Sequence, residues 1–155
     1  MCDESISTSL RRFLGEHSTL SLCTLDPSGR PHAANVYFAP DEELNLFFVS
    51  DPRSLHSRCI AGDPRVAGTV YAPVQMWQQI RGVQFHGSCA MIDPGEYAIV
   101  WKIYLDQFPH IHEVESLVRS QQFYRIRPDW FRYTDNAVHF GHKVETAWPP
   151  MAVGK

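Results

Sequence analysis

Three short apolar segments follow one another within residues 20–50, and the turns that join them are too short for anything but antiparallel pairing. The segments at residues 20–25 and 32–38 are separated by DPSG, in which proline and glycine favour a tight turn. The third segment, residues 44–50, follows a turn that contains PDE. Parallel strands need crossover connections of a dozen or more residues. The sequence therefore predicts an antiparallel meander.

The other elements follow from apolar spacing and from the positions of proline and glycine. Helices are expected at residues 5–17, 54–61 and 93–108, and further strands at residues 65–71, 78–92, 123–134 and 137–142. Gly82 and Gly87 interrupt the longest strand, as glycine does at a bulge or where a ligand approaches closely.

These elements predict a mainly β (α+β) fold, a six- to seven-stranded antiparallel barrel with peripheral helices. Its late strands are expected to pair with its early ones. Residues 1–155 are interpreted as one domain, with an N-terminal helix within residues 1–17 and an irregular tail at residues 147–155.

Composition and charge argue against several classes of protein. The formal net charge of -3 gives no basic field for a nucleic-acid backbone. No apolar run approaches the ~20 residues that cross a bilayer, and the first residues lack the features of a secretion signal. The expected location is the cytoplasm. Cys2, Cys23, Cys59 and Cys89 lie far apart and are therefore expected to be free thiols.

Three segments in a fixed order resemble the FMN-binding split β-barrel family, the group that includes pyridoxamine 5'-phosphate oxidase. They are RPHAANVYF (residues 30–38), FFVSDPRSLHSRCIAGDPRV (residues 47–66) and IRGVQFHG (residues 80–87). RPDWFRYTDN and FGHK also resemble the short bacterial members of this family. The resemblance covers about residues 18–145 and implies a split barrel of the FMN-binding type.

The resemblance assigns the cofactor phosphate to the point where the third strand meets the second helix. A phosphate is held well by N–H groups at a helix N-terminus and by charge-assisted side chains. Many members carry an arginine–lysine pair in this turn, whereas this chain has Arg53 and His56, which implies weaker or pH-sensitive binding. Ordinary helix capping is the alternative reading of these residues. The assigned residues are Val49, Ser50, Arg53, Ser54 and His56.

The resemblance assigns the flavin ring to the second strand and to the start of the long strand. A flat ring requires close approach by the backbone, which small side chains permit, although tight strand packing equally explains two adjacent alanines. Gly82 stands where the oxidase has a glutamine, and this departure puts one flavin contact in doubt. The residues assigned to the ring are His32, Ala33, Ala34, Asn35 and Gly82, and Arg81 is assigned to the ribityl chain or the phosphate.

In this family the flavin lies between two subunits, so the resemblance implies a homodimer. On that reading Trp101, Tyr104 and Phe108 line the interface or cover the cofactor. The alternative reading places these three side chains on the core-facing side of a helix.

Two histidine pairs have spacing that suits metal ligands: His110 with His112, and His139 with His142. The first pair follows a helix stop in an expected loop, and the second is expected on opposite faces of a strand. No metal site is therefore expected. A haem-ligating histidine remains open, because haem-binding relatives share this barrel.

No P-loop, nucleophile elbow or dinucleotide fingerprint occurs in the sequence. The resemblance therefore implies that FMN supplies the redox chemistry of an oxidoreductase acting on a small molecule, without a catalytic side chain. Oxidase activity on pyridoxamine 5'-phosphate is not expected, because the C-terminal WPPMAVGK lacks the segment that grips the substrate phosphate. The alternative is a non-catalytic protein that stores or senses flavin or binds haem, and a deazaflavin is a further possible cofactor.

Overall fold

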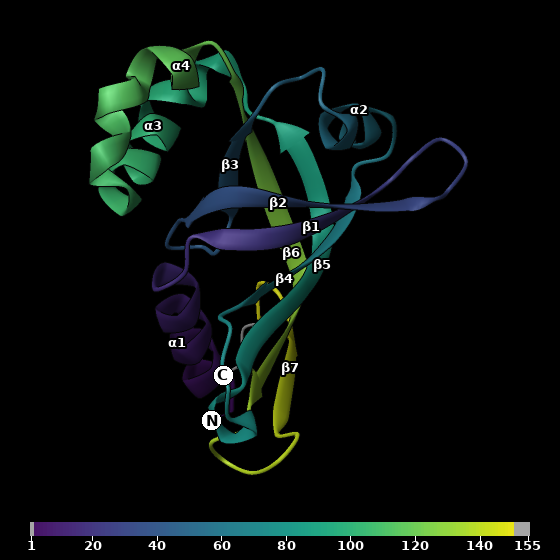
Figure 1. The fold of residues 1–155 in the computed structure, drawn as a ribbon, viewed down its shortest axis with the longest axis vertical. Helices are drawn as coiled ribbons and strands as arrows, with labels where there is room; N and C mark the ends of the chain where they lie inside the picture. The colour runs from purple at the N-terminus through teal and green to yellow at the C-terminus, as the bar shows by residue number, and fades with distance from the viewer. Residues whose placement is uncertain (1, 151–155) are drawn as a thin grey trace, which may run out of the picture.

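The computed structural model describes residues 2–150 (Figure 1). Its helices are α1 (Cys2–Gly15), α2 (Leu55–Gly62), α3 (Tyr97–Gln107) and α4 (Glu115–Arg119), with short 3-10 segments η1 (Trp77–Gln79), η2 (Pro94–Glu96) and η3 (Pro109–Val114). Its strands are β1 (Thr19–Leu25), β2 (Pro31–Pro40), β3 (Leu46–Ser50), β4 (Arg65–Tyr71), β5 (Arg81–Met91), β6 (Gln122–Asp135) and β7 (Lys143–Ala147). Within residues 2–150, no helix is both long and apolar enough to cross a membrane.

The strands form one antiparallel sheet in the order β3-β2-β1-β4-β5-β6-β7. β3 also pairs with β6, from Leu46 opposite Ile126 to Ser50 opposite Gln122. This second pairing closes the first six strands into a barrel and leaves β7 as an extra strand on β6. The predicted split barrel, the meander and the pairing of late with early strands are confirmed.

The barrel interior holds the main core. Side chains alternate between the two faces of a strand, so every second residue of each strand points inward. Helix α1 closes one side of the barrel with Leu10 and Leu14, both fully buried. The aromatic side chains of this core are Phe13, Phe38, Phe48, Phe85, Tyr124, Phe131, Tyr133 and Trp148.

A second, smaller core lies outside the barrel, where α3 covers β3 and the start of β6 (Figure 1). Tyr104 and Phe108 are buried there against Phe47 and Phe123, and Trp101 packs against them while partly exposed. Tyr104 and Phe108 are therefore core residues in this chain, as the alternative reading of the helix expected.

The seventh strand does not lie at residues 137–142, as the sequence analysis expected. Residues 136–142 form a turn in which Gly141 has a φ of 75° and its N–H donates to Asn136 Oδ1 at 3.0 Å. The strand begins only at Lys143 and extends to Ala147, the residue where an irregular tail was expected. Trp148 then folds inward, and its Nε1 donates to the carbonyl oxygen of Glu43 at 2.8 Å. Residues 151–155 of the expected tail lie outside the described residues.

Gly87 lies at a register shift between β5 and β6. A Cβ atom at this position would lie 2.1 Å from the carbonyl oxygen of Arg127, far inside van der Waals contact. Glycine is therefore required here by backbone packing, as the sequence analysis anticipated for a glycine inside a strand.

We expect Gly87→Ala to lower the free energy of unfolding by about 1–3 kcal/mol, because the extra methyl group forces the two strands apart. The measurement is urea unfolding followed by circular dichroism. Gly95→Ala is the matched control, because nothing lies within 4 Å of a Cβ at that position. Equal stability of Gly87→Ala and the parent protein would contradict the packing argument.

Candidate cofactor site

Four polar side chains converge where β3 ends and α2 begins. Ser50 Oγ lies 2.7 Å from His56 Nε2 and 3.1 Å from Ser54 Oγ. Ser57 Oγ donates to Ser50 Oγ at 3.3 Å, and Ser54 Oγ donates to Ser57 Oγ at 2.8 Å. We call Ser50, Ser54, His56 and Ser57 the serine–histidine cluster. The structure thus brings together three of the residues assigned to the phosphate.

The sequence folds this way because Ser54 is a helix N-cap. Its backbone is extended, with φ of -61° and ψ of 155°, and its Oγ accepts a hydrogen bond from the N–H of Ser57. An N-cap of this kind starts the helix and aims its first N–H groups at the cluster. The sequence analysis missed Ser57. It lies three residues after the N-cap Ser54, and this N-cap-to-N3 spacing could have indicated that the two residues interact.

His56 is half-buried beside the core aromatic Phe48. Burial lowers the pKa of His56 below its ordinary value of 6.5, because the cationic imidazolium loses hydration. At neutral pH the cluster therefore offers hydrogen bonds rather than a positive charge. A histidine that titrates at its ordinary pKa was the expectation, and burial is the physical reason for the difference.

Arg53 points away from the serine–histidine cluster. Its side chain is 90% exposed, and its guanidinium lies 2.7 Å from the carboxylate of Asp51. Hydrogen bonds from Arg53 hold the pKa of Asp51 at about 2, so Asp51 is ionised at neutral pH. A phosphate bound at the cluster would compete with Asp51 for Arg53. Val49 lies just before Ser50 on β3 and packs against the second core.

The residues assigned on β2 lie on the outer face of the sheet or at its hairpin. Asn35 is exposed and accepts a hydrogen bond from Ser21 Oγ at 2.8 Å, while Ala33 is exposed and Ala34 half-buried. His32 Nε2 lies 3.0 Å from Asp26 Oδ2 and so supports the β1–β2 turn. Hydrogen bonds from Ser28 and then His32 lower the pKa of Asp26.

β2 reaches the serine–histidine cluster through its pairing with β3. The strands pair at Phe38 and Phe48 in antiparallel register. Asn35 precedes Phe38 and Ser50 follows Phe48, so both lie on the same side of that pair. The assigned β2 residues and the cluster therefore lie toward the same end of the β2–β3 pair, but Ser50 is on the inner face with Phe48, whereas Ala33 and Asn35 are on the outer face.

Arg81 and Gly82 lie at the opposite end of β6. Arg81 pairs with Asp135, the last residue of β6, whereas Ser50 pairs with Gln122, the first. A strand rises about 3.3 Å per residue, so roughly 40 Å of strand separate the two positions. Arg81 also bonds Asp135 through its side chain at 3.2 Å. One protomer thus does not bring Arg81 and Gly82 together with the cluster.

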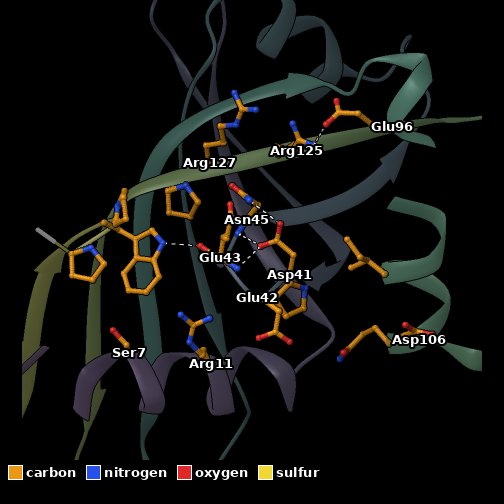
Figure 2. Close-up of a pocket in the computed structure, with 17 residues that line it drawn as sticks. Ser7, Arg11, Asp41, Glu42, Glu43, Asn45, Glu96, Asp106, Arg125 and Arg127 are labelled. Atoms are coloured by element: carbon orange, nitrogen blue, oxygen red, sulfur yellow. Dashed lines mark hydrogen bonds and ion pairs between the residues drawn. The ribbon is translucent and has the colours of Figure 1, made fainter. Parts of the chain in front are cut away.

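A cavity of about 1100 Å³ lies elsewhere, between α1, the β2–β3 turn, α3 and β6 (Figure 2). Three arginines line it, but Asp41, Glu42, Glu43, Glu96 and Asp106 outnumber them. Arg125 is paired with Glu96. The excess of negatively charged carboxylates would repel a phosphate. None of the assigned cofactor residues lines this cavity.

The histidine pairs differ from expectation. His110 and His112 lie in η3 rather than in a loop, and His112 Nδ1 contacts the carbonyl oxygen of Pro109. His139 and His142 lie side by side in the β6–β7 turn, with 3.2 Å between ring nitrogens, and not on opposite faces of a strand. Among residues 6–150, whose side chains the structure describes, no group of three or more His, Cys, Asp or Glu side chains is placed to hold a metal ion.

Three of the cysteines, Cys23, Cys59 and Cys89, are free thiols, as expected. Burial raises the pKa of Cys89 to about 12, so this thiol is unreactive at neutral pH. The side chain of Cys2 lies outside the described residues.

Comparison with known proteins then decides the family. The sequence model of the pyridoxamine 5'-phosphate oxidase family matches residues 6–135. The chain belongs to this family. The chain is also similar to the UPF0306 protein YhbP of Salmonella paratyphi C, which is 29% identical over 138 residues, covering 88% of this chain and 90% of that protein.

Several solved structures share the fold of this chain. A heme binding protein from Mycobacterium smegmatis aligns with a TM-score of 0.74 at 18% identity, over 91% of this chain and 57% of that one. HutZ, a heme storage protein from Vibrio cholerae, aligns with a TM-score of 0.66 at 21% identity, over 78% of this chain and 88% of that one.

We expect His56→Gln to flatten the pH dependence of stability. Because the folded state holds His56 with a lowered pKa, the unfolded chain binds more protons between that pKa and 6.5, and stability falls as the pH falls through this window. Thermal melts between about pH 7.5 and pH 5 measure the slope. His110→Gln, at an exposed site, should keep the parent slope. An unchanged slope in His56→Gln would show that burial does not control its titration.

Proposed function

We propose that this chain binds FMN at the serine–histidine cluster and acts as a homodimeric flavin-dependent oxidoreductase on a small molecule. The observation that carries the proposal is the convergence of three hydroxyl groups and one imidazole on the start of α2. The donor set fits a phosphate, because hydroxyl, imidazole and N–H groups all donate to phosphate oxygens.

FMN supplies the transfer of a hydride or of electrons when it is bound. Ser50, Ser54 and His56 hold the phosphate, and the first N–H groups of α2 complete its hydrogen bonds. The small side chain of Ala33 leaves the β2 backbone open to a flat ring. Arg53 adds a charge-assisted bond if it turns away from Asp51.

A homodimer is part of the proposal because the assigned residues lie in two places. Arg81 and Gly82 are separated from Ser50 by far more than the length of one mononucleotide. Two copies, each giving one group of residues, satisfy both sets of contacts with one cofactor.

We expect Ser50→Ala to weaken FMN binding about tenfold or more, because a hydrogen bond to a charged group contributes about 1.5–3 kcal/mol. Flavin fluorescence titration measures the affinity. Riboflavin lacks the phosphate, and its affinity should change little in the same variant. Ser9→Ala on α1 removes a hydroxyl far from the cluster and is the matched control. A parent protein that does not bind FMN at all would refute the proposal.

Haem binding is the second candidate function, and His86 favours it. Its Nδ1 lies 2.5 Å from Asp129 Oδ1, and its ring stacks on Trp130 at 4.9 Å between centroids. In residues 6–150 no hydrogen bond uses its Nε2, and the side chain is 56% exposed. A carboxylate on Nδ1 is the usual support for a metal-bound imidazole. Two solved structures with this fold are described as heme binding and heme storage proteins.

We expect any haem complex of this chain to use His86 as the axial ligand. Adding haemin to the purified protein and recording the Soret band tests this. His86→Ala should abolish the ligated spectrum, whereas His110→Ala should leave it unchanged. A Soret band that survives in His86→Ala would rule out this ligand.

A further inference from the structure

Two histidine rings meet in the turn between β6 and β7 (Figure 1). Nε2 of His139 lies 3.2 Å from Nδ1 of His142, and the ring centroids are 4.9 Å apart with the ring planes at 79°. The two nitrogens thus face each other, while the rings neither stack nor share a plane. His139 is exposed and His142 is half-buried, so a small ion can reach the pair from solvent.

The other ring nitrogen of His139 fixes the position of its proton. Nδ1 of His139 lies 3.2 Å from the carbonyl oxygen of Phe140. Because a carbonyl oxygen only accepts hydrogen bonds, Nδ1 carries the proton, and Nε2 of the neutral ring keeps a free lone pair. A backbone carbonyl bonded to the second ring nitrogen is also a usual support of a metal-bound histidine, because it fixes the tautomer and the direction of the ring.

The separation of the two facing nitrogens suits a single metal ion. Imidazole nitrogens bind Zn²⁺ at about 2.0–2.1 Å. Two nitrogens that lie 3.2 Å apart then subtend roughly 100° at the ion, between a right angle and the tetrahedral angle. Without an ion, Nδ1 of His142 donates to the lone pair of His139. An ion replaces that proton when His142 changes to its other tautomer.

The turn holds both rings in place before an ion arrives. The N–H of His142 donates to the carbonyl oxygen of His139 at 3.1 Å, and the N–H of Gly141 donates to Asn136 Oδ1 at 3.0 Å. Asn136 is only 6% exposed, and its Nδ2 donates to the carbonyl oxygen of Trp77 at 3.0 Å. The turn is therefore tied to the β4–β5 connection, and this prearrangement lowers the entropy cost of binding.

The donor atoms select the class of ion. Imidazole nitrogens suit Ni²⁺, Cu²⁺ and Zn²⁺, whereas Mg²⁺ and Ca²⁺ prefer oxygen ligands. In the part of the chain whose side chains are described, no third His, Cys, Asp or Glu side chain joins the pair. Water or other exchangeable ligands must therefore fill the remaining positions around an ion.

We propose that His139 and His142 bind one divalent transition-metal ion of the nickel, copper and zinc group in the β6–β7 turn. His139 binds through Nε2 and His142 through Nδ1. This site is separate from both proposed cofactor sites, because it uses neither the serine–histidine cluster nor His86. Two protein ligands leave open positions on the ion, so the ion exchanges with solvent and can take a further ligand.

The first test is isothermal titration with Ni²⁺, which, unlike Cu²⁺, does not oxidise free thiols. The protein is purified without a polyhistidine tag, and we expect one strong site per chain. His139→Ala and His142→Ala should each weaken binding about tenfold or more, because a direct ligand matters at least as much as the outer partners of a metal site. The double variant His139→Ala/His142→Ala should lose the strong site.

The second histidine pair provides the matched control. His112 Nδ1 contacts the carbonyl oxygen of Pro109 rather than the ring of His110. The double variant His110→Ala/His112→Ala should therefore keep the parental affinity for Ni²⁺, and Mg²⁺ should give no binding heat with the parent protein. Parental affinity in His139→Ala/His142→Ala would overturn the inference, and so would an equal loss in His110→Ala/His112→Ala.

The position of the ion can be tested on the parent protein alone. Ni²⁺ is paramagnetic and broadens the NMR signals of nearby amides. Broadening is expected first in residues 136–143, whereas Ser50 and Ser57, toward the other end of β6, should keep their signals. Broadening that begins at any other histidine would overturn the inference without bearing on the binding of FMN.

Discussion

The pairing of β3 with β6 is the constraint on which the rest of the molecule depends. Five residue pairs, from Leu46 with Ile126 to Ser50 with Gln122, join a strand near the N-terminus to one that begins more than 70 residues later. Without this ladder the sheet would keep two open edges and the phenylalanines inside it would face water. Because β3 is fixed along its whole length, Ser50 is delivered to a defined position at the start of the turn into α2.

The candidate site offers an anion hydrogen bonds more than positive charge. Burial keeps His56 neutral, Asp51 occupies Arg53, and the hydroxyl groups of Ser50, Ser54 and Ser57 bond one another. Hydroxyl groups that already satisfy one another can exchange partners when a phosphate arrives, at little cost in unsatisfied polar groups. The cluster is thus suited to a ligand that also gains affinity elsewhere, as a flavin does by burying its ring.

The two proposed cofactor sites lie in different parts of the molecule. The serine–histidine cluster lies at the β3–α2 turn, whereas His86 stands in the middle of the sheet face, braced by Asp129 and Trp130. The two proposals thus place different cofactors on different parts of one barrel.

The sequence by itself determined the order and type of most elements. Turn residues at 26–29 and alternating apolar residues specify β1 and β2 locally, and Ser54 specifies the start of α2 through a hydrogen bond three residues away. It also indicated the family, because three motifs keep their order along the chain. Only the tertiary structure decided that β7 begins at Lys143, since the long turn before it depends on Asn136 bonding Ile80 and Trp77 from a different loop.

Tertiary structure also decided the state of the site. The lowered pKa of His56 depends on burial, the direction of Arg53 on its ion pair with Asp51, and the distance between Ser50 and Arg81 on the length of β6 between their partners. Local sequence encodes hydrogen bonds that span a few residues. It does not encode which distant surfaces exclude water from a side chain. At this site, that exclusion sets the charge of His56.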